Sequence, residues 1–328
     1  MPEFVPQELA AGVFFCTLPL PMKPSHVHVT LVRTGSGWLQ FDSGIYTEES
    51  WSALKDQWRQ VGCHPRDLRI LLVTHHHPDH FGNSGPIVQE SGASAYLHPA
   101  EAAAAQHYLR REHSPEAVAF FRRHGIPLER LGPVPAVGTF WSQFYRPVTN
   151  PLPLTDGQRF QFEGCEVEVI ATPGHTPGHC VFFLSRERLL IVGDHVLPKI
   201  TPHIGRFPSG PENPLRDYLA SLRRIEDLPV NLVLPAHGRP FPDLKRRVQQ
   251  IIQHHEYRLR EMLAAVHGEA RTAYEVASLA WGFDERAPLS VQFPATFEAL
   301  AHLEYLCGEG KVIREEHGDT TRYRALGG

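Results

Sequence analysis

Cysteine is scarce in this sequence and forms no recognisable pattern. The five cysteines are scattered, at positions 16, 63, 165, 180 and 307, and none belongs to a C-x-x-C pair. An odd number of widely spaced cysteines is typical of reduced thiols in a cytoplasmic protein and not of a disulfide framework. Zinc sites built from thiolates are therefore not expected.

Long apolar runs and an excess of one charge are also missing. No segment reaches the roughly 18 apolar residues of a membrane span, and the first eight residues lack the basic start and apolar stretch of an export signal. With 32 Lys and Arg against 36 Asp and Glu, the net charge of -4 gives no whole-chain signature of nucleic-acid binding. We therefore expect a cytoplasmic protein without a membrane partner, and 328 residues suffice for one large domain and a small one.

Histidine, by contrast, is concentrated in one short motif. Residues 74–80 read Thr-His-His-His-Pro-Asp-His and follow an apolar run, residues 69–73, that is typical of a buried strand. In an extended chain the first and third histidines point to the same face, and the proline ends the strand, so that the last two residues lie on the turn beyond it. The candidate ligands are His75, His77, Asp79 and His80. Imidazole and carboxylate groups suit zinc, and iron or manganese less strictly.

Three further strand-like segments each end in a turn that carries one candidate ligand. Residues 167–171 run into Thr-Pro-Gly-His, residues 189–192 into Gly-Asp, and residues 231–234 into Pro-Ala-His-Gly. The candidate ligands at these turns are His175, Asp194 and His237. One isolated histidine would be a hydrogen-bonded loop residue in the simplest interpretation. Four strand ends that each deliver ligands are what a metal site at one edge of a sheet requires.

In their order these residues resemble the metallo-β-lactamase superfamily. Asp42, which follows the strand-like residues 38–41, matches the first motif of that family, and the resemblance covers roughly residues 10–242. It implies an α+β fold, a four-layer αββα sandwich with two metal ions at one edge. The ligands it implies are His75, His77 and His175 for the first metal, Asp79, His80 and His237 for the second, and Asp194 as the bridge. Asp42 would either support these ligands or cap a turn.

An insertion extends the predicted catalytic domain, residues 1–243. Residues 99–150 read as Ala-rich and Arg-rich helices followed by a segment rich in proline and aromatic residues. This insertion would form either a lid beside the substrate or a peripheral packing element. Long connections within a compact domain are usually either functional or disordered, and the aromatic residues argue against disorder.

A second domain is predicted at residues 244–328. A long helix is followed by helices near residues 272–281 and 294–308, and then by a hairpin that turns at Gly318-Asp319. This order resembles the winged helix of the lactamase-β-like branch, the relatives of glyoxalase II. The third helix is acidic and contains no Lys or Arg, so duplex DNA is not an expected partner. Packing or homodimerisation is the favoured role.

The chemistry that the resemblance implies is hydrolysis with two metal ions. Two ions about 3.5–4 Å apart supply a bridging hydroxide, polarise the bond under attack and stabilise the charge left behind. Asp79 and Asp194 would take part as well as hold the metals. A small acyl thioester or ester is the favoured substrate; a single-stranded RNA endonuclease and a non-enzymatic metal-dependent sensor are the alternatives. His179 is assigned a supporting role, and the nearby His195, Lys199 and His203 would either contact an anionic substrate or be ordinary loop residues.

Overall fold

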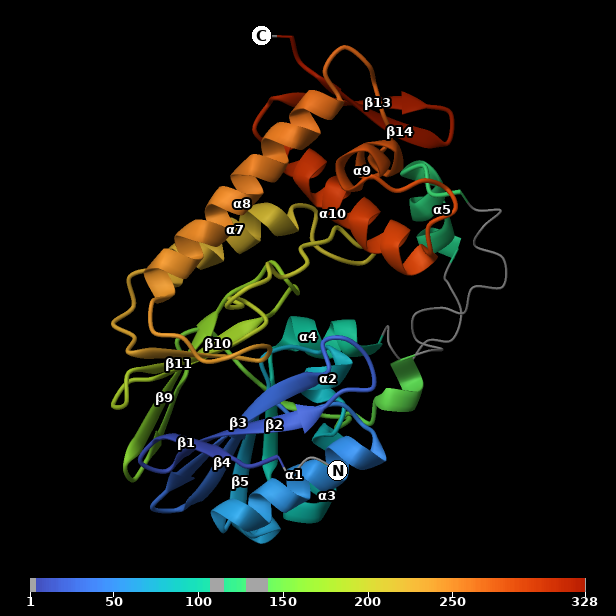
Figure 1. Cartoon of the computed structure of the whole chain (residues 1–328). Coiled ribbons are helices and arrows are strands. Elements are labelled where there is room, and N and C mark those ends of the chain that lie inside the picture. Colours follow the sequence, from blue (N-terminus) through green and yellow to red (C-terminus); the bar gives the residue numbers. More distant parts are fainter. Residues whose placement is uncertain (1–3, 107–114, 128–140, 328) are drawn as a thin grey trace.

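The computed structural model describes residues 4–106, 115–127 and 141–327, which form two large sheets with helices outside them (Figure 1). The first sheet has the order β1 (Gln7–Ala10), β2 (Val13–Pro19), β3 (His26–Thr34), β4 (Gly37–Phe41), β5 (Leu68–Leu72), β6 (Ser94–Leu97) and β7 (Leu152–Pro153). The second has the order β12 (Leu232–Pro235), β11 (Leu189–Gly193), β10 (Cys180–Leu184), β9 (Cys165–Ala171) and β8 (Arg159–Phe162). Both sheets are mixed, because β4–β7 and the pair β11–β12 are parallel and the other neighbours are antiparallel.

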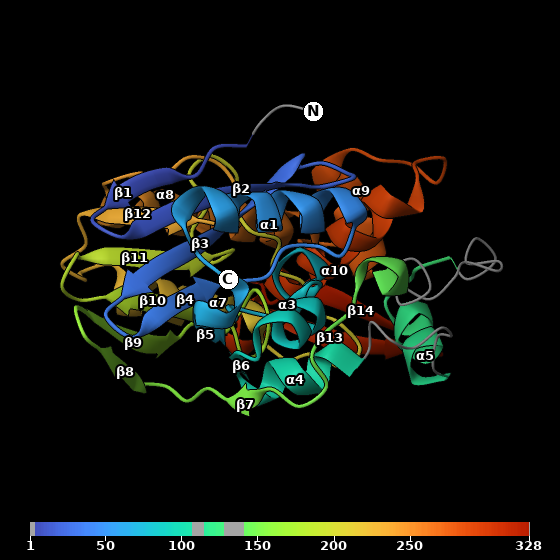
Figure 2. The ribbon, with the colours of Figure 1, turned by 90° about the horizontal axis from the view of Figure 1, so that it is seen from below.

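The apolar side chains divide the molecule into layers. Trp58 of α1 (Glu48–Val61) and Ile87 of α3 (Ser84–Ser91) are buried against the first sheet. A second cluster, which includes Phe41 and Phe182, fills the space between the sheets. Helices α7 (Pro214–Ile225) and α8 (Leu244–Ala265) cover the outer face of the second sheet. The resulting order of helix, sheet, sheet and helix agrees with the predicted four-layer sandwich (Figure 2).

Local sequence signals account for where the helices begin and end. Thr47 caps α1 by accepting a hydrogen bond from the backbone N–H of Ser50, and Gly62 ends the helix with a positive φ of 76°. Two short helices begin at a proline: α2 (Pro78–Phe81), which contains the last three residues of the histidine motif, and α4 (Pro99–Ala105), which follows β6. Proline stands at the first position of both, where its missing N–H costs nothing.

The predicted insertion at residues 99–150 is described only in part. Its described pieces are α4, α5 (Pro115–Arg123) and the single 3₁₀ turn Ser142–Phe144. Residues 107–114 and 128–140 lie outside the described residues. Helix α5 lies against α10 (Leu289–Gly308), with the rings of Phe121 and Phe293 stacked 5.5 Å apart. This part of the insertion therefore packs on the C-terminal helices.

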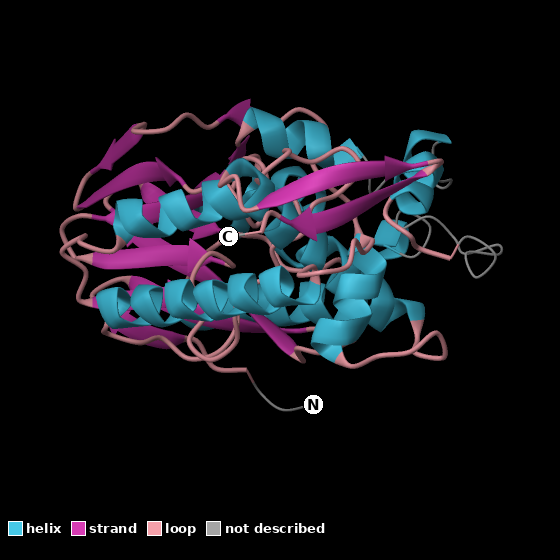
Figure 3. Ribbon diagram, turned by 90° about the horizontal axis from the view of Figure 1, so that it is seen from above, coloured by secondary structure: helices cyan, strands magenta, loops and turns pink. Residues whose placement is uncertain are grey.

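The C-terminal region contains α8, α9 (Ala273–Trp281), α10 and the antiparallel pair β13 (Val312–His317) and β14 (Thr320–Ala325). Figure 3, seen from above, shows the two strands of this hairpin in front of the helices. The hairpin turns where predicted, with Gly318 at a φ of 59°. The predicted start of the last helix at Pro294 was wrong, because Pro294 lies inside α10. A proline in the second turn of a helix removes one intrahelical hydrogen bond, and here the helix continues through it.

The apolar core does not stop at the predicted domain boundary. Leu244, Val248 and Ile251 of α8 belong to the cluster that covers the second sheet, and Ala301 of α10 joins it. The division at residue 243 and the winged-helix assignment stay predictions. Within the residues that the structure describes, no helix has the length and hydropathy of a membrane span.

Candidate metal centre

The seven predicted ligands come from four strand ends and lie close together at one edge of the two sheets. His75 and His77 lie between β5 and α2, and the next two candidates, Asp79 and His80, lie in α2. Strand β5 ends at Leu72. The segment after His75 and His77 was expected to be a turn, and it forms the short helix α2. The helix turns Asp79 and His80 back toward the histidine pair. The other three candidates closely follow β9, β11 and β12, as the sequence predicted.

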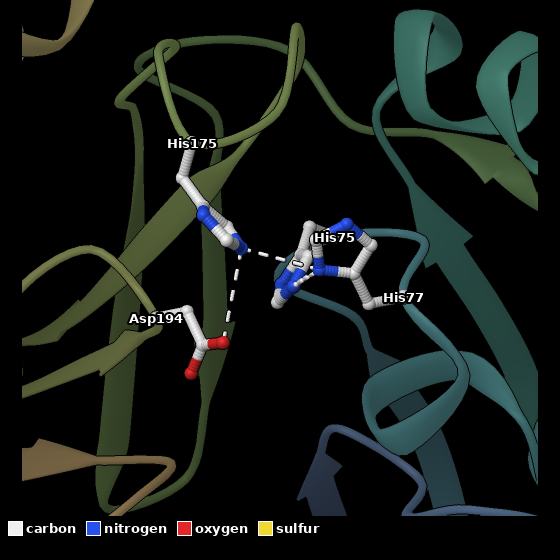
Figure 4. Close-up of side chains that lie close together, drawn as sticks. All are labelled: His75, His77, His175 and Asp194. Atoms are coloured by element: carbon white, nitrogen blue, oxygen red, sulfur yellow. Dashed lines mark hydrogen bonds and ion pairs between the residues drawn. The ribbon is translucent and has the colours of Figure 1, made fainter. Parts of the chain in front are cut away.

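One group consists of His75, His77, His175 and Asp194 (Figure 4). Their candidate ligand atoms all lie within 4.8 Å of one another. The Nδ1 atom of His77 is 2.9 Å from Nε2 of His75 and 3.2 Å from Nε2 of His175. The carboxylate of Asp194 approaches from the other side, with Oδ2 3.7 Å from Nε2 of His175. Three imidazoles and one carboxylate therefore surround one point.

A second group consists of Asp79, His80 and His237, again within 4.8 Å of one another. Oδ2 of Asp79 lies 3.2 Å from Nε2 of His237 and 3.6 Å from Nε2 of His80. Oδ1 of Asp194 lies 3.5 Å from His237 Nε2 and 3.6 Å from His80 Nε2. The two oxygens of Asp194 thus face different groups, Oδ2 the first and Oδ1 the second.

Four of the candidate histidines have a contact at Nδ1, the ring nitrogen that points away from the site. The Nδ1 contacts are His75 to Thr74 Oγ1 at 3.0 Å, His80 to Asp42 Oδ2 at 2.8 Å, His175 to the carbonyl of His203 at 3.0 Å, and His237 to the carbonyl of His26 at 2.9 Å. Carbonyl and carboxylate oxygens only accept hydrogen bonds, so the last three rings carry a proton on Nδ1. In the neutral form of these rings the Nε2 lone pair points into the site, which is the arrangement that supports a metal-binding histidine.

The polar atoms inside the site fit a divalent cation. Nε2 of His80 and Oδ1 of Asp194 are buried and have no hydrogen-bond partner among the described residues. Burial, with neighbouring imidazoles, holds the pKa of His75 and of His77 well below the usual value, so both rings are in the neutral, metal-binding form. Neutral imidazole and carboxylate donors match zinc, and also iron or manganese.

The carboxylates in and around the second group (Asp79, His80 and His237) favour positive charge there. Burial alone would lower the pKa of His237, but Asp194 and Asp79 raise that pKa to about 9. Burial would likewise lower the pKa of His80, and the same two carboxylates together with Asp42 raise it well above its usual value. Concentrated negative charge of this kind stabilises a bound cation as it stabilises the protonated imidazole.

Asp42 supports the ligand segment, which is the first of the two roles that the sequence left open. It is buried at the end of β4 with a positive φ of 61°, which is unusual for any residue other than glycine. Its carboxylate accepts hydrogen bonds from the backbone N–H of Thr74 at 2.7 Å and from the Thr74 hydroxyl at 3.0 Å, as well as from His80. The turn residue therefore also orients a candidate ligand.

Sequence reasoning missed Glu101 of α4 and Tyr145. The fully buried Glu101 carboxylate accepts hydrogen bonds from the N–H of His76 at 2.9 Å, from the ring of His76, and from the N–H of Gly178. The buried Tyr145 hydroxyl donates to the carbonyl of His76 at 2.9 Å. A glutamate in an Ala-rich helix carries no sequence signal that separates it from an exposed one. Both residues belong to the predicted insertion, which therefore supports the ligand loops from inside and includes more than a lid.

A two-sheet sandwich that gathers imidazoles and carboxylates at one edge is an architecture able to hold metal ions. The family model of the metallo-beta-lactamase superfamily matches residues 22–237, and the chain belongs to this superfamily. The crystal structure of a metallo-beta-lactamase family protein from Thermus thermophilus is similar with a TM-score of 0.81 and 32% identity. That alignment covers 97% of this chain and 100% of the other.

Two curated relatives are similar over a shorter stretch. The lactamase-like protein adaB of Aspergillus niger is 40% identical over 111 residues, which are 34% of this chain and 32% of that protein. The atrochrysone carboxyl ACP thioesterase of Aspergillus fumigatus is 34% identical over 127 residues, 39% of this chain and 38% of that protein. The chain thus spans about a third of the length of these two relatives.

Proposed function

We propose that the protein is a dinuclear metal-dependent hydrolase that acts on a small acyl thioester or ester. The observation that carries this proposal is the position of Asp194, with one carboxylate oxygen beside each of two ligand groups. A carboxylate so placed would serve two cations together. Zinc is the metal that the donor set fits best.

Each part of the chain then has a defined task. His75, His77 and His175 would hold one cation and the second group another, and Asp194, whose two oxygens face different groups, would contribute to both sites. Bound cations would lower the pKa of a water molecule and polarise a carbonyl oxygen. Asp42 and the backbone carbonyls keep the rings oriented and their Nε2 atoms directed into the site. Asp79, within the second group, is placed so that it would accept the proton that water loses on attacking the carbonyl and pass it to the leaving thiolate or alkoxide as the scissile bond opens.

Cysteine does not offer an alternative nucleophile. Four of the five cysteines are buried, and burial raises the pKa of Cys63 and of Cys165 to about 12 and that of Cys307 to about 11. The thiolate is the nucleophilic form, and these thiols stay protonated at neutral pH. Hydrolysis through a thioester to the protein itself is therefore disfavoured, which supports direct attack by water.

The choice of a thioester substrate has one further support. The Aspergillus fumigatus relative is, by its name, an acyl carrier protein thioesterase. We assign the chain to the glyoxalase II-related branch, with residues 244–328 as a winged-helix-like domain, because their helices and hairpin follow that order.

A substrate panel tests this function. Zinc-loaded protein is assayed with acyl thioesters, lactones and labelled single-stranded RNA, beside Asp194→Ala as the matched control. We expect thioester hydrolysis by the wild type and none by the variant. Hydrolysis confined to lactones would replace the thioester by a lactone as the assigned substrate. Metal-dependent cleavage of the RNA would favour the endonuclease alternative. A zinc-loaded protein inactive on the whole panel would contradict the proposal.

A further inference from the structure

The connection between β11 and α7 links the candidate metal centre with the C-terminal helix α10 through its residues 195–213. The ring of His203 donates a hydrogen bond from Nε2 to the carbonyl of Pro294 at 2.9 Å. The backbone N–H of Arg206 donates to the carbonyl of Phe297 at 3.0 Å. Both carbonyls belong to α10, so the loop is joined to this helix by one side-chain bond and one backbone bond.

Ring contacts hold the same loop in place. The phenyl ring of Phe207 packs on that of Phe297, with centroids 5.0 Å apart. The guanidinium group of Arg206 lies over the ring of Phe120 in α5, 5.2 Å from its centroid. The loop is therefore fixed to α10 at three neighbouring points and contacts α5 as well.

The loop is also fixed to the metal centre. The backbone carbonyl of His203 accepts the hydrogen bond from Nδ1 of His175 at 3.0 Å. His203 thus has two different contacts: its carbonyl faces a candidate ligand, and its ring faces the carbonyl of Pro294. Because a carbonyl oxygen only accepts, the direction of both bonds is fixed. His203 Nε2 carries a proton, and His175 keeps its proton on Nδ1 and its lone pair on Nε2.

We propose that His203 is a positioning residue through which α10 holds His175 in its metal-binding orientation. The inference rests on the proposed function, because it assumes that His175 binds a metal ion. It adds a defined task for the C-terminal region, which is to order one ligand of the first group. Helix α10 makes this contact from 91 residues away in sequence, whereas His175 and His203 are 28 residues apart.

The packing around His203 supports a fixed position of its ring. A methyl group added at Gly205 would lie 2.6 Å from Cε1 of His203 and 3.0 Å from the ring of Phe207. The absence of a side chain at residue 205 therefore leaves the space that both rings occupy. The ring of His203 also lies 5.9 Å from that of Phe207, which itself packs on α10.

The second group provides an internal reference, because its contacts are different. His237 donates to the carbonyl of His26 in β3, and His80 to the carboxylate of Asp42. Neither contact involves α10 or the loop of residues 195–213. Loss of the His203 hydrogen bond should therefore weaken the first cation site and leave the second almost unchanged. Removing a group bonded directly to a metal ligand lowers metal affinity by about 10–100-fold; the ring of His203 acts one contact further away, through its own backbone carbonyl, so a smaller loss is expected.

The test compares zinc affinities by chelator competition in the full-length protein. His203→Phe keeps a ring beside Phe207 but has no donor for Pro294, and His203→Gln keeps an N–H donor. His267→Phe changes an exposed histidine just after the end of α8 and serves as the matched control. Circular dichroism of each protein establishes that it is folded.

We expect His203→Phe to bind one of two zinc ions more weakly, by up to about 10-fold, the lower end of the loss for a direct partner, with the other ion and the control unchanged. His203→Gln should retain most of the affinity. Wild-type affinities in His203→Phe would overturn the inference, as would an equal loss in His203→Gln. A wild-type protein that binds no zinc would instead overturn the proposed function, and this inference with it.

Discussion

Asp194 is the residue on which the two ligand groups meet. Its two carboxylate oxygens lie 3.5–3.7 Å from three different imidazoles. Burial alone would raise the pKa of Asp194, but His237 and His80 hold it well below the usual value. The carboxylate is therefore charged across the neutral range, as a group shared by two cations must be.

Asp194→Ala should remove more metal and more activity than His237→Ala. Loss of Asp194 affects both groups, whereas loss of His237 affects the second group alone. We expect hydrolysis to fall by at least roughly 10²-fold, beyond the effect of losing a residue that only orients a ligand. Metal content and turnover of the two variants are measured side by side. Equal metal content in both would contradict a shared role for Asp194.

Glu101→Ala should destabilise the protein and loosen the ligand loops. The change leaves the buried N–H groups of His76 and Gly178 without their acceptor. We expect a loss of about 2–5 kcal/mol in the free energy of unfolding, the range for breaking buried charged contacts. Urea denaturation measures it, with Glu90→Ala on the exposed side of α3 as the control. A loss no larger than in the control would show that Glu101 does not hold the loops.

At the scale of secondary structure, the histidine motif and the strand ends were predictable, and their supports were not. Apolar strands followed by turns indicated where His175, Asp194 and His237 would lie, because local patterns define strand ends. The contacts of Glu101 and His203 join segments that are far apart in sequence, and no local pattern encodes them. Helix α7 was also not identified from the sequence, although a proline at its first position and a capping asparagine mark its start.

Helices α8 and α10 share a buried histidine pair that predicts a pH dependence. His255 and His302 are fully buried, with Nδ1 of His255 3.2 Å from Nε2 of His302. Burial lowers the pKa of His255 to about 2 and that of His302 to about 4. An unfolded histidine has a pKa of about 6.5. Below that pH the unfolded chain binds protons that the folded pair excludes, so stability is lost as the pH falls from about 6.5 toward 4.

Replacing both histidines should therefore reduce the effect of acid on stability. The double variant His255→Leu and His302→Leu removes both members of the contact together, so neither ring is left facing an apolar side chain. Melting temperatures are measured at two pH values, near neutral and mildly acidic, in chelator so that metal release does not contribute. We expect acid to lower the melting temperature of the double variant less than that of the wild type, by roughly 2 °C or more. An equal decrease in both proteins would show that the pair does not exclude protons.

At the scale of the whole molecule, the C-terminal region ends in a hairpin whose arginines are paired with glutamates. Arg314, Arg322 and Arg324 each form an ion pair with a glutamate, Glu304, Glu275 and Glu315 respectively. Binding to the phosphates of DNA requires cationic side chains that are not already paired with carboxylates. These arginines instead connect the hairpin to α9, to α10 and across its own two strands.

Duplex DNA should accordingly bind weakly or not at all. We expect no saturable binding tighter than about 10⁻⁶ M at low salt, the limit of ordinary non-specific association. A titration with labelled duplex, repeated at higher salt, measures this. Tight, salt-sensitive binding would contradict the assignment of the region to packing and ligand support, and would favour the sensor alternative.

The central claim, a hydrolase with two joined metal sites, is tested most directly by a zinc titration of metal-stripped protein during hydrolysis of an acyl thioester. Two ligand groups joined by Asp194 predict that turnover is absent without metal and rises until two ions are bound per chain. Turnover that is already complete without metal, or that stays absent when both sites are filled, would contradict the proposed hydrolase.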